Sequence, residues 1–115
     1  MSTRTRSARP RLHDRPPFGD ELSFELEALF KALANEGRLR MLHEINRAGE
    51  LSVGAIADSV GMSPQAVSNQ LQRLADRGVV RARRDGSHIH YRIVNRCVPE
   101  LLDLAVCHVE QERSG

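Results

Sequence analysis

The sequence has few aromatic residues, two cysteines and no long hydrophobic run. Only 3% of its 115 residues are aromatic. The core must therefore consist of aliphatic residues, which favours a helical domain over an all-β sandwich. No apolar run approaches the roughly 18–20 residues that cross a bilayer, and none follows the N-terminal arginines, so we expect neither a membrane partner nor a secretory signal. Two cysteines are too few for a disulfide scaffold, which predicts a reduced, cytoplasmic protein.

The basic residues are almost all arginine, and they fall in two zones. The 17 basic and 15 acidic residues leave a net charge of only +2, and Lys31 is the one lysine. Residues 1–19 and 69–96 are strongly basic, whereas residues 20–60 are net acidic. This pattern is typical of a chain that meets a polyanion with one face, although a solvated arginine-rich surface remains the alternative.

Length and proline content predict one folded domain preceded by an arm. A chain of 115 residues corresponds to a single domain. Residues 1–19 are rich in arginine and proline and lack an apolar period, so we interpret them as a flexible arm. Residues 20–115 then form the DNA-binding and dimerisation domain that the patterns below indicate.

Apolar residues at helical spacing predict four helices in the first part of this domain. The first runs from about Asp20 to Leu33, and the second begins at the N-cap Asn35 and stops at Gly49. The other two are listed by their limits: Ser52 to Gly61, and Ser63 to about Arg77. Ser63-Pro64 is a strong helix-start signal, and two short helices joined by a glycine turn predict a helix-turn-helix.

The period then changes to two, which predicts a hairpin. Residues 79–84 and 88–93 alternate as strands around Asp85-Gly86, a strong turn signal. A last helix begins at the cap Asn95, carries Pro99 in its first turn and ends near Glu112. The predicted fold is mainly α with a small β-hairpin: a dimeric winged helix-turn-helix with an extra helix at each end.

The helix that begins after Ser63 has the surface of a DNA-reading helix. A plain αα-hairpin would expose Glu and Lys there, whereas these positions are uncharged or basic hydrogen-bonding residues. Such side chains pair with base edges or hold phosphates in the major groove, and arginines in a wing reach the backbone or the minor groove. The predicted contacts to double-stranded operator DNA are Ser63, Gln65, Ser68, Asn69, Gln72, Arg73, Arg83 and Arg84.

The outer helices carry more apolar residues than one small core can absorb. We therefore predict a homodimer interface, which would also place two recognition helices on a palindrome. The residues concerned are Phe24, Leu29, Leu101, Leu104, Val106 and Val109.

The last helix also carries candidate metal ligands. His108 and Glu112 share a helix face at i, i+4. Cys97 lies too far along the helix to join them in one chain, but an antiparallel partner helix would bring it near, giving mixed ligation for Zn, Ni, Co or Cd. A Cys or His on an apolar helix is more often structural, so a core role stays open.

At this point several ordered motifs resemble the ArsR/SmtB family of bacterial winged-helix repressors. They cover about residues 22–112: Leu33-Ala34-Asn35-Glu36-Gly37-Arg38-Leu39-Arg40-Met41-Leu42, Ser63-Pro64-Gln65-Ala66-Val67-Ser68-Asn69-Gln70-Leu71, and Arg83-Arg84-Asp85-Gly86 followed by His90-Tyr91-Arg92-Ile93. The resemblance implies a homodimer that binds an operator and is released by an effector, usually a metal ion.

The chain departs from the family pattern at both known metal sites. The thiolate pair is absent, because Ser52 and Gly54 occupy its positions. At the site between the last helices, His108 fits outright and Cys97 is a plausible substitute, whereas Asn95 and Gln111 are poor ligands. The family's Ser-x-His-Leu recognition element reads Ser68-Asn69-Gln70-Leu71, which implies a different operator preference.

Three functions follow from these residues, and none of them is enzymatic, because no nucleophile–base pair or phosphate loop is present. The first is a repressor released by a metal ion bound by Cys97, His108 and Glu112 across the dimer. The second is a repressor that senses thiol oxidation or reactive sulfur through Cys97 and Cys107. The third is an effector-independent winged-helix regulator, or a winged domain used only for protein docking.

Overall fold

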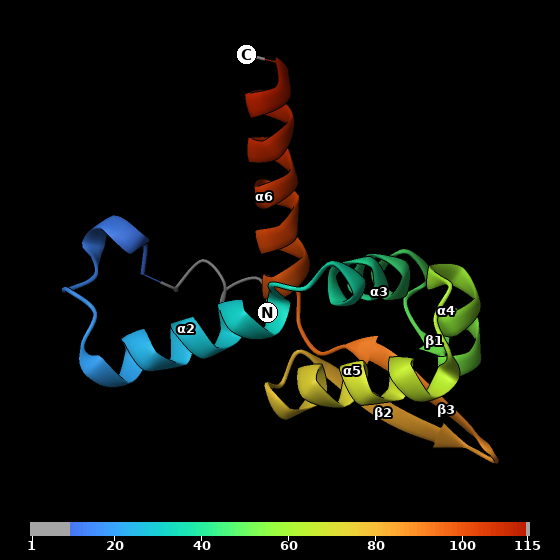
Figure 1. The fold of residues 1–115 in the computed structure, drawn as a ribbon. Coiled ribbons are helices and arrows are strands. Elements are labelled where there is room, and N and C mark those ends of the chain that lie inside the picture. Colours follow the sequence, from blue (N-terminus) through green and yellow to red (C-terminus); the bar gives the residue numbers. More distant parts are fainter. Residues whose placement is uncertain (1–9, 115) are drawn as a thin grey trace.

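The computed structural model describes residues 10–114 and confirms the winged helix-turn-helix fold (Figure 1). The element order is η1 (Leu12–Asp14), α2 (Asp20–Leu33), α3 (Glu36–Ala48), β1 (Leu51–Ser52), α4 (Val53–Val60), α5 (Pro64–Asp76), β2 (Val80–Asp85), β3 (His88–Ile93) and α6 (Cys97–Ser114). Residues 1–9 of the predicted arm lie outside the described part, and residues 10–19 are all exposed around the short η1.

The predicted helix limits are confirmed by their caps. Side-chain oxygens of Asn35, Ser52 and Ser63 accept the backbone N–H three residues ahead, at 3.0, 3.1 and 3.1 Å. Gly49 and Gly61 follow α3 and α4 with φ of 87° and 72°, a region where a side chain would be strained. The chain therefore makes its sharp turns where the sequence places them.

The wing is larger than the predicted hairpin, because β1 adds a third strand. The sheet has the order β1-β3-β2 and is antiparallel, with Leu51 opposite Tyr91. A strand of two residues has no period to detect, which is why the sequence did not predict it. Its effect is to attach the wing to the segment between α3 and α4.

The core is aliphatic, as the composition predicts. Its fully buried side chains are Met41, Leu42, Ile45, Ile56, Val67, Leu71 and Leu74, which come from α3, α4 and α5. Tyr91 of β3 is also buried, whereas Phe18, Phe24 and Phe30 are exposed. Helices α3, α4 and α5 thus share one core with the inner face of the wing.

Helices α2 and α6 extend away from this core (Figure 1). The radius of gyration is 16.0 Å, against about 13 Å for a compact domain of this length. Asn95 accepts a hydrogen bond from the Cys97 amide at 2.9 Å, and α6 continues to Ser114, two residues beyond the predicted end. Among residues 10–114, no helix is long and apolar enough to span a membrane.

Candidate DNA-binding surface

Helix α5 separates its apolar residues cleanly from its polar ones. Val67, Leu71 and Leu74 are buried in the core. The opposite side is polar: Ser68 is half-buried, and the exposed residues are Ser63 at the cap, Gln65, Asn69, Gln72 and Arg73. All six predicted contacts in and before α5 therefore retain some solvent access, and five of them are exposed.

Two side-chain pairs order the amides along this surface. Gln65 Nε2 donates to Asn69 Oδ1 at 3.1 Å, and Gln72 Nε2 donates to Asp76 Oδ1 at 3.0 Å. Both pairs are spaced i, i+4, so each lies along one side of the helix. The Asn69 amide keeps its own N–H groups for an outside acceptor, because its carbonyl oxygen is the one engaged.

The two wing arginines lie on opposite faces of the sheet. Arg84 is paired with Ile89, on the face that carries buried Tyr91 and on which α5 packs. Arg83 is paired with His90, on the outer face. Successive residues of a strand point to opposite sides, so Arg83 and Arg84 leave the sheet in opposite directions.

Arg83 is held by Glu50, a contact that sequence reasoning missed. Its Nε and Nη2 donate to the two carboxylate oxygens of Glu50 at 3.1 and 2.7 Å. These hydrogen bonds lower the pKa of Glu50 below its usual value and raise that of Arg83. Glu50 directly precedes β1, so the pair attaches the wing to the body.

The candidate effector residues are all exposed on α6. His108 Nε2 lies 3.5 Å from Glu112 Oε2, as their spacing predicts. Cys97 is eleven positions before His108, about 16 Å along the helix at 1.5 Å per residue, and Cys107 is exposed as well. Within residues 10–114 of one chain, no three His, Cys, Asp or Glu side chains are grouped closely enough to hold a metal ion.

Most of the predicted interface residues are uncovered in a single chain. Phe24 of α2 is 69% exposed, and Leu104 of α6 is 71% exposed. Val106 and Val109 are exposed as well and line a groove of about 610 Å³ between α3 and α6. Leu29 and Leu101 differ from the expectation, because both are half-buried against the core.

A second contact that the sequence did not predict connects three helices. Arg38 of α3 donates through Nε to the Ala32 carbonyl of α2 at 2.6 Å. Its Nη1 donates to Gln70 Oε1 of α5. Ala32 is six positions from Arg38, but Gln70 is 32 positions away, so no local pattern could have identified the link between α3 and α5.

Comparison with known proteins shows which family the chain belongs to. A sequence profile described as the MarR family matches residues 35–88, which include the helix-turn-helix and the first wing strand. The HTH-type transcriptional regulator NmtR of Mycobacterium tuberculosis is 34% identical over 99 residues, covering 86% of this chain and 82% of NmtR. A homodimeric winged helix-turn-helix domain from Mycobacterium bovis, described as possibly of the ArsR family, has a TM-score of 0.74 at 34% identity, covering 85% of this chain and 93% of that one.

The chain belongs to the ArsR/SmtB family. The crystal structure of AntR, described as an antimony-specific transcriptional repressor, has a TM-score of 0.80 at 50% identity, covering 93% of this chain and 96% of AntR. The protein is accordingly a DNA-binding transcriptional repressor and not an enzyme, as the resemblance of its motifs implies.

Proposed function

We propose that this ArsR/SmtB repressor binds a palindromic operator as a homodimer, with one α5 in each of two major-groove half-sites. The observation that carries the proposal is the exposed polar side of α5, which offers amide, hydroxyl and guanidinium groups but no exposed carboxylate before Asp76. Gln65, Ser68, Asn69 and Gln72 read base edges or nearby phosphates, and Ser63 and Arg73 hold the backbone.

In the wing, the same proposal assigns different weights to the two arginines. Arg84 shares the sheet face on which α5 packs, so it reaches DNA alongside the recognition helix. Arg83 contacts DNA only by leaving Glu50 or by sharing it, since both carboxylate oxygens already accept from its guanidinium.

The wing assignment is tested by salt dependence on an operator selected from a random double-stranded library. Each phosphate contact that is lost reduces the slope of log K against log salt by about 1. We expect Arg84→Gln to reduce the slope by about that amount and Arg83→Gln to change it less. Equal slopes for wild type and Arg84→Gln would contradict the assignment, and no selected sequence at all would contradict operator binding.

The effector proposed here is a metal ion bound between the α6 helices of the dimer. Cys97, His108 and Glu112 are suitable donors, since thiolate, imidazole and carboxylate together suit Zn, Ni, Co or Cd. They fit only across the dimer, because Cys97 lies at one end of α6 and His108 toward the other. An antiparallel α6 pair would bring Cys97 close to the partner's His108.

A second ligand set is favoured by the 50% identity to a repressor described as antimony-specific. Antimony(III) is a soft ion that prefers thiolates, and both cysteines of this chain are exposed on α6. The antiparallel arrangement that brings Cys97 near the partner's His108 also brings it near the partner's Cys107, the adjacent residue. In this version two chains supply the thiolates and His108 is not a ligand.

Three variants separate these ligand sets. Operator affinity is measured by fluorescence anisotropy while wild type, Cys97→Ser, Cys107→Ser and His108→Ala are titrated with Zn, Ni, Co, Cd and antimony(III). Allosteric couplings are typically about 5–150-fold, so we expect one ion to weaken wild-type binding by at least tenfold.

The pattern among the variants identifies the ligands. Mixed ligation predicts that Cys97→Ser and His108→Ala lose the response while Cys107→Ser keeps it. Thiolate ligation predicts that both cysteine variants lose the antimony response while His108→Ala keeps it. If the operator affinity of the wild-type dimer is the same with and without each ion, the metal proposal is wrong. A thiol sensor would instead release DNA on mild oxidation.

A further inference from the structure

Arg38 of α3 contacts both α2 and α5, and it does not belong to the candidate DNA-binding surface. Its guanidinium is partly buried and donates to Ala32 O at the end of α2 and to Gln70 Oε1 of α5, with a longer contact of 3.5 Å to Lys31 O. The last carbonyls of a helix have no partner within the helix, so Arg38 caps α2 while it holds α5. One side chain of α3 therefore links the outer helix to the recognition helix.

A second link joins α2 to α5 farther along. Arg77, directly after α5, lies 3.0 Å from Glu25 of α2. The two links are seven residues apart on α2 and seven residues apart on the chain of α5, which is about 10.5 Å on each helix. They also run in opposite order, since the later residue of α2 pairs with the earlier residue of α5.

Two separated attachments fix an angle as well as a distance. A single contact would let α5 pivot against α2, whereas two attachments two turns apart prevent that rotation. The Arg38 link is the stronger of the two, because hydrogen bonds from a charged group in a partly buried place exceed an exposed ion pair. Glu25 is 59% exposed, so its pair with Arg77 is screened by water and salt.

We propose that Arg38 is a positioning residue for DNA recognition, which sets the orientation of α5 relative to α2 through Gln70. This inference rests on the proposed function, in which two α5 helices read one palindrome, and on the predicted dimer interface, which includes the exposed Phe24 of α2. If the angle between α2 and α5 is fixed, the separation of the two recognition helices is fixed as well. The preferred spacing of operator half-sites then depends on the contacts of Arg38.

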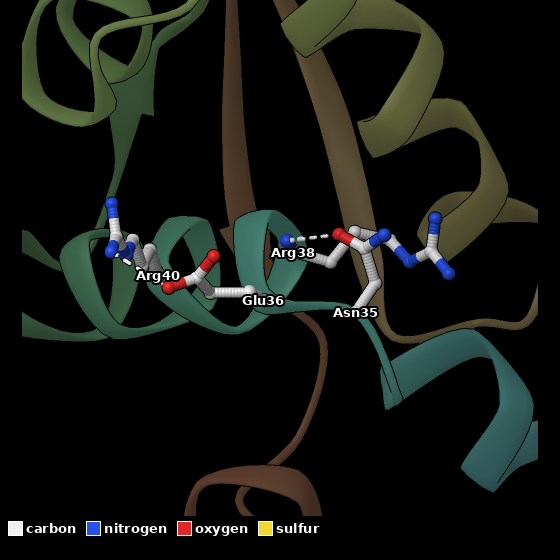
Figure 2. Close-up of polar contacts among 4 residues, drawn as sticks. All are labelled: Asn35, Glu36, Arg38 and Arg40. Carbon is white, nitrogen blue, oxygen red and sulfur yellow. Dashed lines mark hydrogen bonds and ion pairs between the residues drawn. The ribbon is translucent and has the colours of Figure 1, made fainter.

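Arg40 provides a matched control on the same helix. Figure 2 shows that Arg38 and Arg40 point to opposite sides of α3, with Arg40 turned toward Glu36. Arg40 Nη2 donates to Glu36 Oε2 at 2.8 Å, an exposed i, i+4 pair that remains within α3. Arg40→Ala removes the same charge from the same helix, so it controls for charge and for general loss of helix stability.

The experiment measures the dependence of affinity on half-site spacing. A palindromic operator is selected with the wild-type dimer, and its centre-to-centre spacing is then lengthened or shortened by one and two base pairs. Affinities for the series are measured with wild type, Arg38→Ala, Arg38→Lys, Gln70→Ala and Arg40→Ala, together with the thermal midpoint of each protein. Gln70→Ala removes the same link without altering charge, and it serves if Arg38→Ala does not fold.

In the expected result, wild type and Arg40→Ala share one steep spacing profile. Arg38→Ala and Gln70→Ala bind the optimal spacing about tenfold more weakly and lose much less on the altered spacings, so their profiles are flatter. Arg38→Lys falls between them, since an ammonium cannot span both acceptors as a planar guanidinium does. The double variant Arg38→Ala/Gln70→Ala is no weaker than Arg38→Ala alone, because Arg38→Ala already removes the link to Gln70.

A different result would contradict the positioning role. A merely structural Arg38 would lower the thermal midpoint and weaken binding uniformly, leaving the profile as steep as that of wild type, and this overturns the positioning role alone. A wild-type chain that selects no operator overturns the proposed function and the positioning role with it.

Discussion

Helices α5 and α6 differ in how much of their apolar surface one chain can cover. In α5, Val67, Leu71 and Leu74 are completely buried. In α6, which has 18 residues, only Val98 and Pro99 at its start are buried. The DNA-reading half of the molecule is thus complete within one chain, whereas the α6 half presents an apolar face to solvent. A face of this kind is what a second copy would cover. The proposed effector site therefore needs two chains, whereas each proposed DNA-reading surface is formed within one chain.

The largest expected effect follows from the full burial of the apolar residues of α5 within one chain. Leu71→Ala should lower the free energy of unfolding by about 2–5 kcal/mol, because the cavity adds to the lost transfer energy. Urea denaturation measures this difference in the free energy of unfolding between variant and wild type. We expect the same difference at low and at high protein concentration. A loss below about 1 kcal/mol would show that this core position can collapse around the missing atoms.

A second substitution tests the apolar face of α6. Leu104→Asp places a charge on the proposed interface and should weaken dimerisation at least about 30-fold, as expected for an interface residue worth 2 kcal/mol or more. Sedimentation equilibrium measures the dissociation constant, and operator binding should fall with it. Leu12→Asp is the matched control, since Leu12 is 73% exposed and lies outside α6. Equal dissociation constants for both variants would place the interface elsewhere.

The smallest effect concerns the wing. Because Arg83 donates two hydrogen bonds to Glu50, the pKa of Glu50 is lowered from its ordinary value of 4.5. A lowered pKa means that the pair stabilises the fold above that ordinary value and that the contribution is lost as pH falls through the lowered pKa. A carboxyl-carbon NMR titration should show a lower Glu50 pKa in wild type than in Arg83→Gln. Identical titrations would mean that the ion pair does not persist in solution.

The sequence predicted those features that depend on neighbouring residues. Asn35 and Ser63 cap their helices within three positions, so local pattern identifies them. The hairpin was identified in the same way, but its turn lies one residue later than predicted: Asp85 ends β2 opposite His88, and Gly86 and Ser87 make the turn. The helix-turn-helix and the wing followed from the order of such signals. The exposed positions of α5 followed as well, because a helix with one fully apolar side has a defined polar side.

Features that depend on residues far apart in the sequence could not be predicted from it. Arg38 meets Gln70, and Arg83 meets Glu50, across 32 and 33 positions, and neither pair leaves a periodic signal. The sequence showed a surplus of apolar residues, but Leu29 and Leu101 were counted in it although both pack against the core. How far α6 extends beyond the core is decided by packing, which composition does not encode.

The scarcity of aromatic residues also makes the wing observable. The sequence has no tryptophan and one tyrosine, Tyr91, which is buried in the central strand of the three-stranded sheet. Excitation of tyrosine therefore reports on one place in the molecule, and no indole quenches or obscures its emission. Changes in Tyr91 fluorescence would follow the attachment of the wing to the core in the native, unlabelled protein, during unfolding and on addition of an effector.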